Sequence, residues 1–139
     1  MGRILAIDYG RRRCGIAVTD PLRLSINPRD PVEPAQLLSQ VLELARDGDL
    51  DAVVLTRSAH RDGTPNPIQR DIDRFAARLN DALPELELAF EDEFGTSREA
   101  SDHLRATGVP KGRRSRKGAL DSVSAGLILE RYLRDRGIW

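Results

Sequence analysis

Short apolar runs separated by glycine, proline and charged residues divide the chain into strand-like and helix-like segments. Residues 4–7 and 15–18 are two such runs, rich in branched aliphatic side chains, and the segment between them carries Gly10 and three arginines. Runs of this length, bounded by turn residues, predict two adjoining strands of a hairpin.

A third strand is predicted directly after the hairpin. Leu22, Leu24 and Ile26 alternate with polar residues, and alternation over this length indicates a strand with one exposed face. The following residues, 28–34, contain three prolines, which predict a loop.

In the middle of the chain, segments whose apolar residues recur at helical spacing alternate with segments that have the apolar pattern of a strand. One helix is predicted to end at Gly48, and a second to begin with a cap at Thr64 and to end at Pro84. Strands are predicted for residues 52–55 and for the alternating residues 86–90, which lead into Asp92 and Glu93. The helical stripes are Leu37, Leu38, Val41, Leu42 and Ala45 in the first helix, and Ile68, Ile72, Phe75, Ala76 and Leu79 in the second.

Two further helices are predicted near the end of the chain. Thr96 and Glu99 have the spacing of a capping box and predict a helix over residues 96–107. A basic loop, residues 111–117, separates it from a final apolar helix over residues 119–134. Three successive strands followed by alternating helices and strands predict an α/β domain, a mixed sheet with helices on its faces.

Composition narrows the class of protein without selecting a function. The 139 residues suit one domain, and 22 basic and 22 acidic residues give a formal net charge of zero, so only local patches could attract a polyanion. The one cysteine, Cys14, excludes an internal disulfide and is expected to be a buried small side chain. No signal peptide or membrane span is evident, so we expect a soluble, cytoplasmic protein with no membrane partner.

Three carboxylates are candidates for one site, and two of them, Asp8 and Asp121, stand where an acid is costly without a positive partner. Asp8 ends the first apolar strand, Glu93 follows the fifth, and Asp121 lies within the apolar final helix. Ligands lie outside the carboxyl ends of strands in such sheets, so the three acids can meet there. Carboxylates without histidine or cysteine suit Mg²⁺ or Mn²⁺, and two ions about 4 Å apart can clamp a phosphodiester.

Each acid also has a structural interpretation. Asp8 could cap the Gly10 turn, Glu93 could be a solvated loop residue, and Asp121 could favour the positive end of its helix. The metal site therefore depends on all three acids meeting.

Two basic clusters lie beside these acids in the sequence. One follows Asp8 and the other precedes Asp121, where a nucleic-acid backbone would need positive charge. A charge run is more often only solvated surface. The candidate nucleic-acid-binding residues are Arg11, Arg12 and Arg13 in the first cluster, and Lys111, Arg113, Arg114, Arg116 and Lys117 in the second.

These motifs resemble the YqgF family, also called RuvX, whose members are Holliday-junction resolvases and pre-16S rRNA processing nucleases. The likeness covers nearly the whole chain: residues 6–10 with 15–18, residues 62–64, residues 92–97 and residues 121–133 match the family's motifs in order. It implies an RNase H-like fold with a mixed five-stranded sheet, three antiparallel strands and then two parallel ones, in a single nuclease domain over residues 1–139. It also implies that Asp8, Glu93 and Asp121 are catalytic residues that bind Mg²⁺ or Mn²⁺.

By the same resemblance, the expected activity is hydrolysis of phosphodiester bonds in structured RNA or branched DNA. The reactions implied are processing of the 5′ end of pre-16S rRNA and Holliday-junction resolution, with ribosomal precursor particles as a further partner and a monomer or weak homodimer as the state. Two departures, residues 56–58 in place of Gly-Leu-Pro and Phe94 in place of arginine, favour an alternative: a catalytically impaired nucleic-acid-binding or ribosome-assembly module. An actin-like or sugar-kinase-like ATPase, suggested by Asp8 and Gly10, is disfavoured, because such an enzyme needs two domains of this size and the chain has no P-loop.

Overall fold

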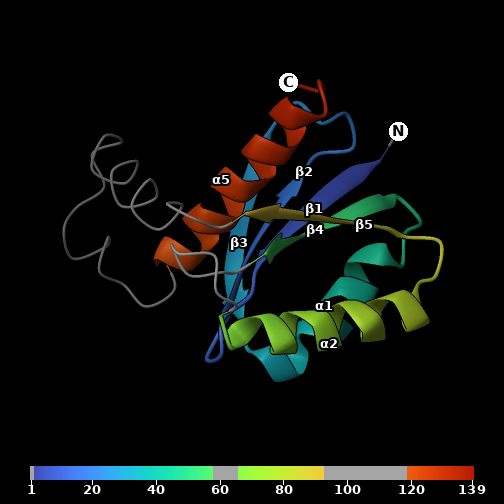
Figure 1. Ribbon diagram of the computed structural model, residues 1–139. Coiled ribbons are helices and arrows are strands. Elements are labelled where there is room, and N and C mark those ends of the chain that lie inside the picture. Colours follow the sequence, from blue (N-terminus) through green and yellow to red (C-terminus); the bar gives the residue numbers. More distant parts are fainter. Residues whose placement is uncertain (1, 58–65, 93–118) are drawn as a thin grey trace.

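The computed structural model describes residues 2–57, 66–92 and 119–139 of the chain. Within them, five strands and three helices form a sheet with helices on both faces (Figure 1). The elements in chain order are β1 (Arg3–Asp8), β2 (Cys14–Thr19), β3 (Ile26–Val32), α1 (Pro34–Ala45), β4 (Leu50–Arg57), α2 (Ile68–Ala82), β5 (Glu87–Asp92) and α5 (Ala119–Asp135).

The sheet has the mixed topology that the sequence predicts. Its strand order is β3-β2-β1-β4-β5. β1 pairs antiparallel with β2, and β2 antiparallel with β3, whereas β1 pairs parallel with β4, and β4 parallel with β5. The prediction of three antiparallel strands followed by two parallel ones is therefore confirmed.

Two apolar cores cover the two faces of the sheet. Alternate residues of each strand point to opposite faces, and on β1 Leu5 and Ile7 join the core under α1 and α2, whereas Ile4 and Ala6 join the core under α5. Figure 1 shows α5 on one side of the sheet and α1 with α2 on the other. Cys14 is fully buried in the first core, as expected.

The prediction for the third strand is wrong in position. Leu22 and Leu24 are 64% and 75% exposed and precede the strand, which runs over Ile26–Val32 and contains two of the prolines that predicted a loop. β3 is the edge strand next to β2. Proline lacks the N–H that a central strand needs, but an edge strand can turn that position outward.

The second helix begins later than predicted. Thr64 and Pro65 lie outside the described residues, and α2 starts at Ile68, whose N–H donates to the side-chain oxygen of Asn66 at 3.2 Å. The helix predicted for residues 96–107 and the basic loop 111–117 also lie outside the described residues. The final helix, α5, agrees with its prediction to within one residue.

Candidate functional site

The carboxyl ends of the parallel strands define one edge of the sheet. β1, β4 and β5 run in the same direction and end at Asp8, Arg57 and Asp92. The segment between β1 and β2, which carries Arg11, leaves from this edge. Ligand sites in sheets of this kind lie at such an edge.

Asp8 is directed to the face of the sheet that α5 covers. It lies two residues beyond Ala6 and four beyond Ile4, both of which pack in the core under α5, and residues at this spacing in a strand share a face. Asp8 is half-buried and stands opposite Gly15 on β2. Because glycine has no side chain, the position facing Asp8 across the hairpin leaves room for another group.

The first turn of α5 lies at the same level of the sheet. Ser122 donates a hydrogen bond from Oγ to the carbonyl oxygen of Arg29 at 2.6 Å. Arg29 pairs with Ile16, and Ile16 pairs with Ile7, the residue before Asp8. Asp121, which directly precedes Ser122 in α5, therefore has its backbone at the edge where β1 ends.

A second contact ties α5 to the end of β5. Arg131 donates from Nη1 to the carbonyl oxygen of Asp92 at 2.5 Å. On the same strand, burial and the neighbouring carboxylate of Asp135 raise the pKa of Glu91. Glu91 thus faces α5, and Asp92, one residue later, faces the opposite side.

The structure brings together part of the predicted metal site. It places Asp8 and the backbone of Asp121 at one edge, whereas Glu93 lies outside the described residues. Among the residues that the structure describes, no group of three or more His, Cys, Asp or Glu side chains could hold a metal ion. Of the basic candidates, Arg11 and Arg12 are exposed and Arg13 is half-buried, while the second cluster lies outside the described residues.

Thr56 is a polar residue at this edge to which the sequence gave no role. Its hydroxyl is fully buried and has no hydrogen-bond partner among the residues described. It follows Leu55, which pairs with Ile7, and it shares the α5 face with Val54. Thr56 and Asp8 are therefore neighbours on one face, and the only signal in the sequence is a polar residue at the end of an apolar run.

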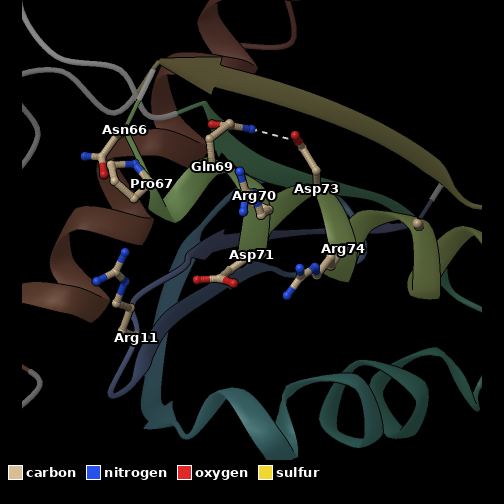
Figure 2. A pocket seen from close by; sticks show the side chains of 9 residues that line it. Arg11, Asn66, Pro67, Gln69, Arg70, Asp71, Asp73 and Arg74 are labelled. Carbon is tan, nitrogen blue, oxygen red and sulfur yellow. Dashed lines mark hydrogen bonds between the residues drawn. The ribbon is translucent and has the colours of Figure 1, made fainter. Parts of the chain in front are cut away.

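An open groove of about 950 Å³ lies on the other side of this edge. Figure 2 shows Arg11 on one side of the groove and residues of α2 on the other, with Arg70 and Arg74 among them. Arg11 was a candidate from the sequence, but the two α2 arginines were not. Their spacing of four residues was the signal that could have pointed to one exposed helix face.

None of the described helices has the length and apolar composition that crossing a membrane requires.

Comparisons with known proteins agree on one family. The model of a family described as RuvX, Holliday junction resolvase, matches residues 2–135. Proteins of Chlorobium phaeobacteroides and Chlorobium luteolum, both named "Putative pre-16S rRNA nuclease", are 35% and 38% identical to this chain. The first alignment covers 97% of this chain and 94% of the relative, and the second covers 96% and 95%.

Solved structures resemble the fold over almost the full length. The structure described as T. thermophilus RuvC in complex with Holliday junction substrate superposes with a TM-score of 0.59 at 15% sequence identity. The match covers 97% of this chain and 96% of the RuvC chain. The expected RNase H-like sheet is therefore confirmed at the level of the fold.

Proposed function

This chain belongs to the RuvX family of Holliday junction resolvases, and we propose that it is a metal-dependent nuclease that hydrolyses phosphodiester bonds in structured nucleic acid. One observation carries the proposal: Asp8 and the first turn of α5, which bears Asp121, lie at the same edge of the sheet. Asp8 and the backbone of Asp121, which are far apart in the sequence, thereby lie at one end of the sheet.

The donor chemistry at this edge fits a hard divalent cation. Asp8, Glu93 and Asp121 would supply only carboxylate oxygens, the ligands that Mg²⁺ and Mn²⁺ prefer. The buried Thr56 hydroxyl without a partner among the described residues adds a polar atom that a bound group or water could satisfy.

The residues of this chain would then divide the work between them. A divalent ion, when bound, supplies Lewis acidity to the phosphate and lowers the pKa of water. Asp8, Glu93 and Asp121 would hold the ion. The arginines of the turn, Arg11, Arg12 and Arg13, and the basic residues of 111–117 hold the nucleic-acid backbone through their charge.

The preferred substrate in this proposal is the 5′ end of pre-16S rRNA within ribosomal precursor particles in the cytoplasm. The names of the bacterial relatives support pre-16S rRNA as the substrate, and the family name supports a four-way DNA junction as the other substrate to test. A monomer suffices for a single cut, whereas paired cuts in a junction require a two-fold dimer.

The test compares Asp8→Asn with Asp92→Asn as a matched control. Both residues end strands at the same edge, but Asp92 faces away from α5. Labelled precursor RNA and a four-way DNA junction are incubated with Mg²⁺, with Mn²⁺ or with EDTA. We expect Asp8→Asn to lower the cleavage rate by about 100-fold or more, and Asp92→Asn to change it by no more than about twofold.

Two outcomes would overturn this proposal. Equal cleavage by the wild-type protein and Asp8→Asn would remove Asp8 from the chemistry. Metal-independent binding of both substrates by the wild-type protein, without any product, would instead identify the chain as a catalytically impaired nucleic-acid-binding or ribosome-assembly module.

A further inference from the structure

We propose that the groove between the β1–β2 turn and α2 binds the sugar-phosphate backbone of a nucleic-acid strand through Arg70, Arg74 and Arg11. The proposal rests on the proposed function and adds a binding surface to it. The groove has a volume of about 950 Å³, and Arg11 and the first turns of α2 line it from opposite sides (Figure 2).

The arginines of α2 form a row along its exposed face, because the opposite, apolar face of the helix packs in the core. Ile72, Phe75 and Leu79 are buried in the core, so the opposite face of α2 is exposed. Arg70, Arg74 and Arg78 lie on that exposed side, four residues apart. Because an α-helix rises about 1.5 Å per residue, successive arginines are about 6 Å apart along its axis.

This row stands beside the edge that carries Asp8. The ring of Tyr9, the residue after Asp8, lies 6.0 Å from the ring of Phe75 between centroids. Arg11, three residues after Asp8, lines the same groove as Arg70 and Arg74, so the groove lies close to the end of β1.

The ion pairs between described residues use other arginines. They include the pairs of Arg3 with Asp49, Arg23 with Asp51, Arg134 with Glu130 and Arg136 with Glu87. Within the described part of the chain, none of these pairs engages an arginine of the groove. Its guanidinium groups are thus available to an external anion.

The spacing and charge fit a nucleic-acid strand better than a single anion. Arg70 and Arg74 are about 6 Å apart along the helix axis and Arg11 lies across the groove from them, whereas a strand of a duplex presents a charge about every 3.4 Å along its axis. An isolated phosphate could meet only one or two of these arginines. A strand can meet both Arg70 and Arg74 and also Arg11 across the groove.

Two aspartates also line the groove and oppose such a ligand. Asp73 accepts a hydrogen bond from Nε2 of Gln69 at 2.9 Å, drawn as a dashed line in Figure 2. Asp71 is half-buried in the first turn of α2 and opens toward the groove. Because the negative charge of Asp71 repels a polyanion, removing that charge is expected to strengthen polyanion binding.

The experiment measures the binding of a fluorescein-labelled single-stranded RNA by fluorescence anisotropy, in EDTA and in the Asp8→Asn background, so that cleavage does not interfere. Arg74→Ala and Arg70→Ala are compared with Arg46→Ala, which removes the same charge from an exposed position at the end of α1. That end lies at the opposite edge, because Arg3, the first residue of β1, donates to the carbonyl oxygen of Leu44 at 2.9 Å.

We expect Arg70→Ala and Arg74→Ala each to weaken binding about fivefold at 0.1 M salt. Each is also expected to make the negative slope of log K against log salt shallower by about 0.7. Arg46→Ala is expected to leave both quantities within experimental error, and Asp71→Asn to tighten binding about twofold. Equal effects of Arg74→Ala and Arg46→Ala, or weaker binding by Asp71→Asn, would overturn the proposal. Because the readout is binding alone, a failure of cleavage leaves a positive result for the groove intact.

Discussion

Two buried threonines on the strands that flank β1 provide a matched test of the structure. Thr19 of β2 is 1% exposed, and its hydroxyl accepts a hydrogen bond from the N–H of Ile4 at 2.9 Å. Thr56 of β4 is fully buried, and its hydroxyl has no partner among the described residues. Valine has nearly the same shape as threonine, so Thr19→Val and Thr56→Val each remove one hydroxyl and little else.

The two substitutions are expected to have opposite signs. A buried polar group without a partner costs about 1–3 kcal/mol, so Thr56→Val is expected to raise the free energy of unfolding by about that amount. Thr19→Val leaves the N–H of Ile4 unpaired and is expected to lower it by about 1–3 kcal/mol. For 139 residues the entropy of unfolding is about 0.3 kcal/mol/K, so each effect corresponds to a change of about 3–10 °C in Tm.

The assay is thermal and urea unfolding of both variants, followed by circular dichroism in EDTA so that no metal contributes to stability. A rise in Tm for Thr56→Val and a fall for Thr19→Val is the expected pair of results. If Thr56→Val lowers Tm as much as Thr19→Val does, the Thr56 hydroxyl has a partner and the assignment of an unpaired group beside Asp8 is wrong.

Two further predictions concern α5. Burial and Asp135 raise the pKa of Glu91, so its protonated form is favoured in the folded state and the stability that it contributes is lost as pH rises through that pKa. Glu91→Gln is therefore expected to raise Tm at pH 7–8 and to have no effect below about pH 4, which unfolding at a series of pH values measures; a pH-independent change would contradict it. Ser122→Ala removes the hydrogen bond to Arg29 and is expected to lower the free energy of unfolding by about 1 kcal/mol. It is also expected to weaken the Mg²⁺-induced rise in Tm, because Asp121 lies in the helical turn that this hydrogen bond positions. An unchanged Mg²⁺ effect would mean that the bond does not position the metal site.

The central strands are buried on both faces of the sheet, and this explains why the sequence predicts their positions better than that of β3. Residues 4–7, 15–18 and 52–55 form central strands between two helical layers, so both sets of alternating positions are apolar. β3 has no such protection, because it lies at an edge and its exposed residues carry no apolar pattern. The alternating leucines before it belong to a turn in which Asp20 accepts hydrogen bonds from the backbone of Leu24 and Ser25, each at 2.7 Å.

The sequence predicts only those residues of the candidate site that stand out against an apolar strand or helix. The position of Asp8 follows from the apolar run before it, and that of Asp121 from a charge in an apolar helix. The groove could not be predicted in the same way. Arg70 and Arg74 have the spacing of any solvated helix face, and only the approach of the β1–β2 turn with Arg11 to α2, a tertiary contact, gives them a common partner.

Because successive side chains of β1 point to opposite faces of the sheet, the proposed catalytic site and the proposed binding groove lie on different faces. Asp8 faces α5, and Tyr9, one residue later, packs against Phe75 of α2 on the other side of the sheet. Asp8 therefore lies on one face of the sheet, and Arg70 and Arg74 of the groove lie on the other. A strand can contact both only by crossing the carboxyl edge of the sheet, where Arg11 stands between them. A structured or branched nucleic acid, whose backbone turns sharply, suits this path better than a straight duplex.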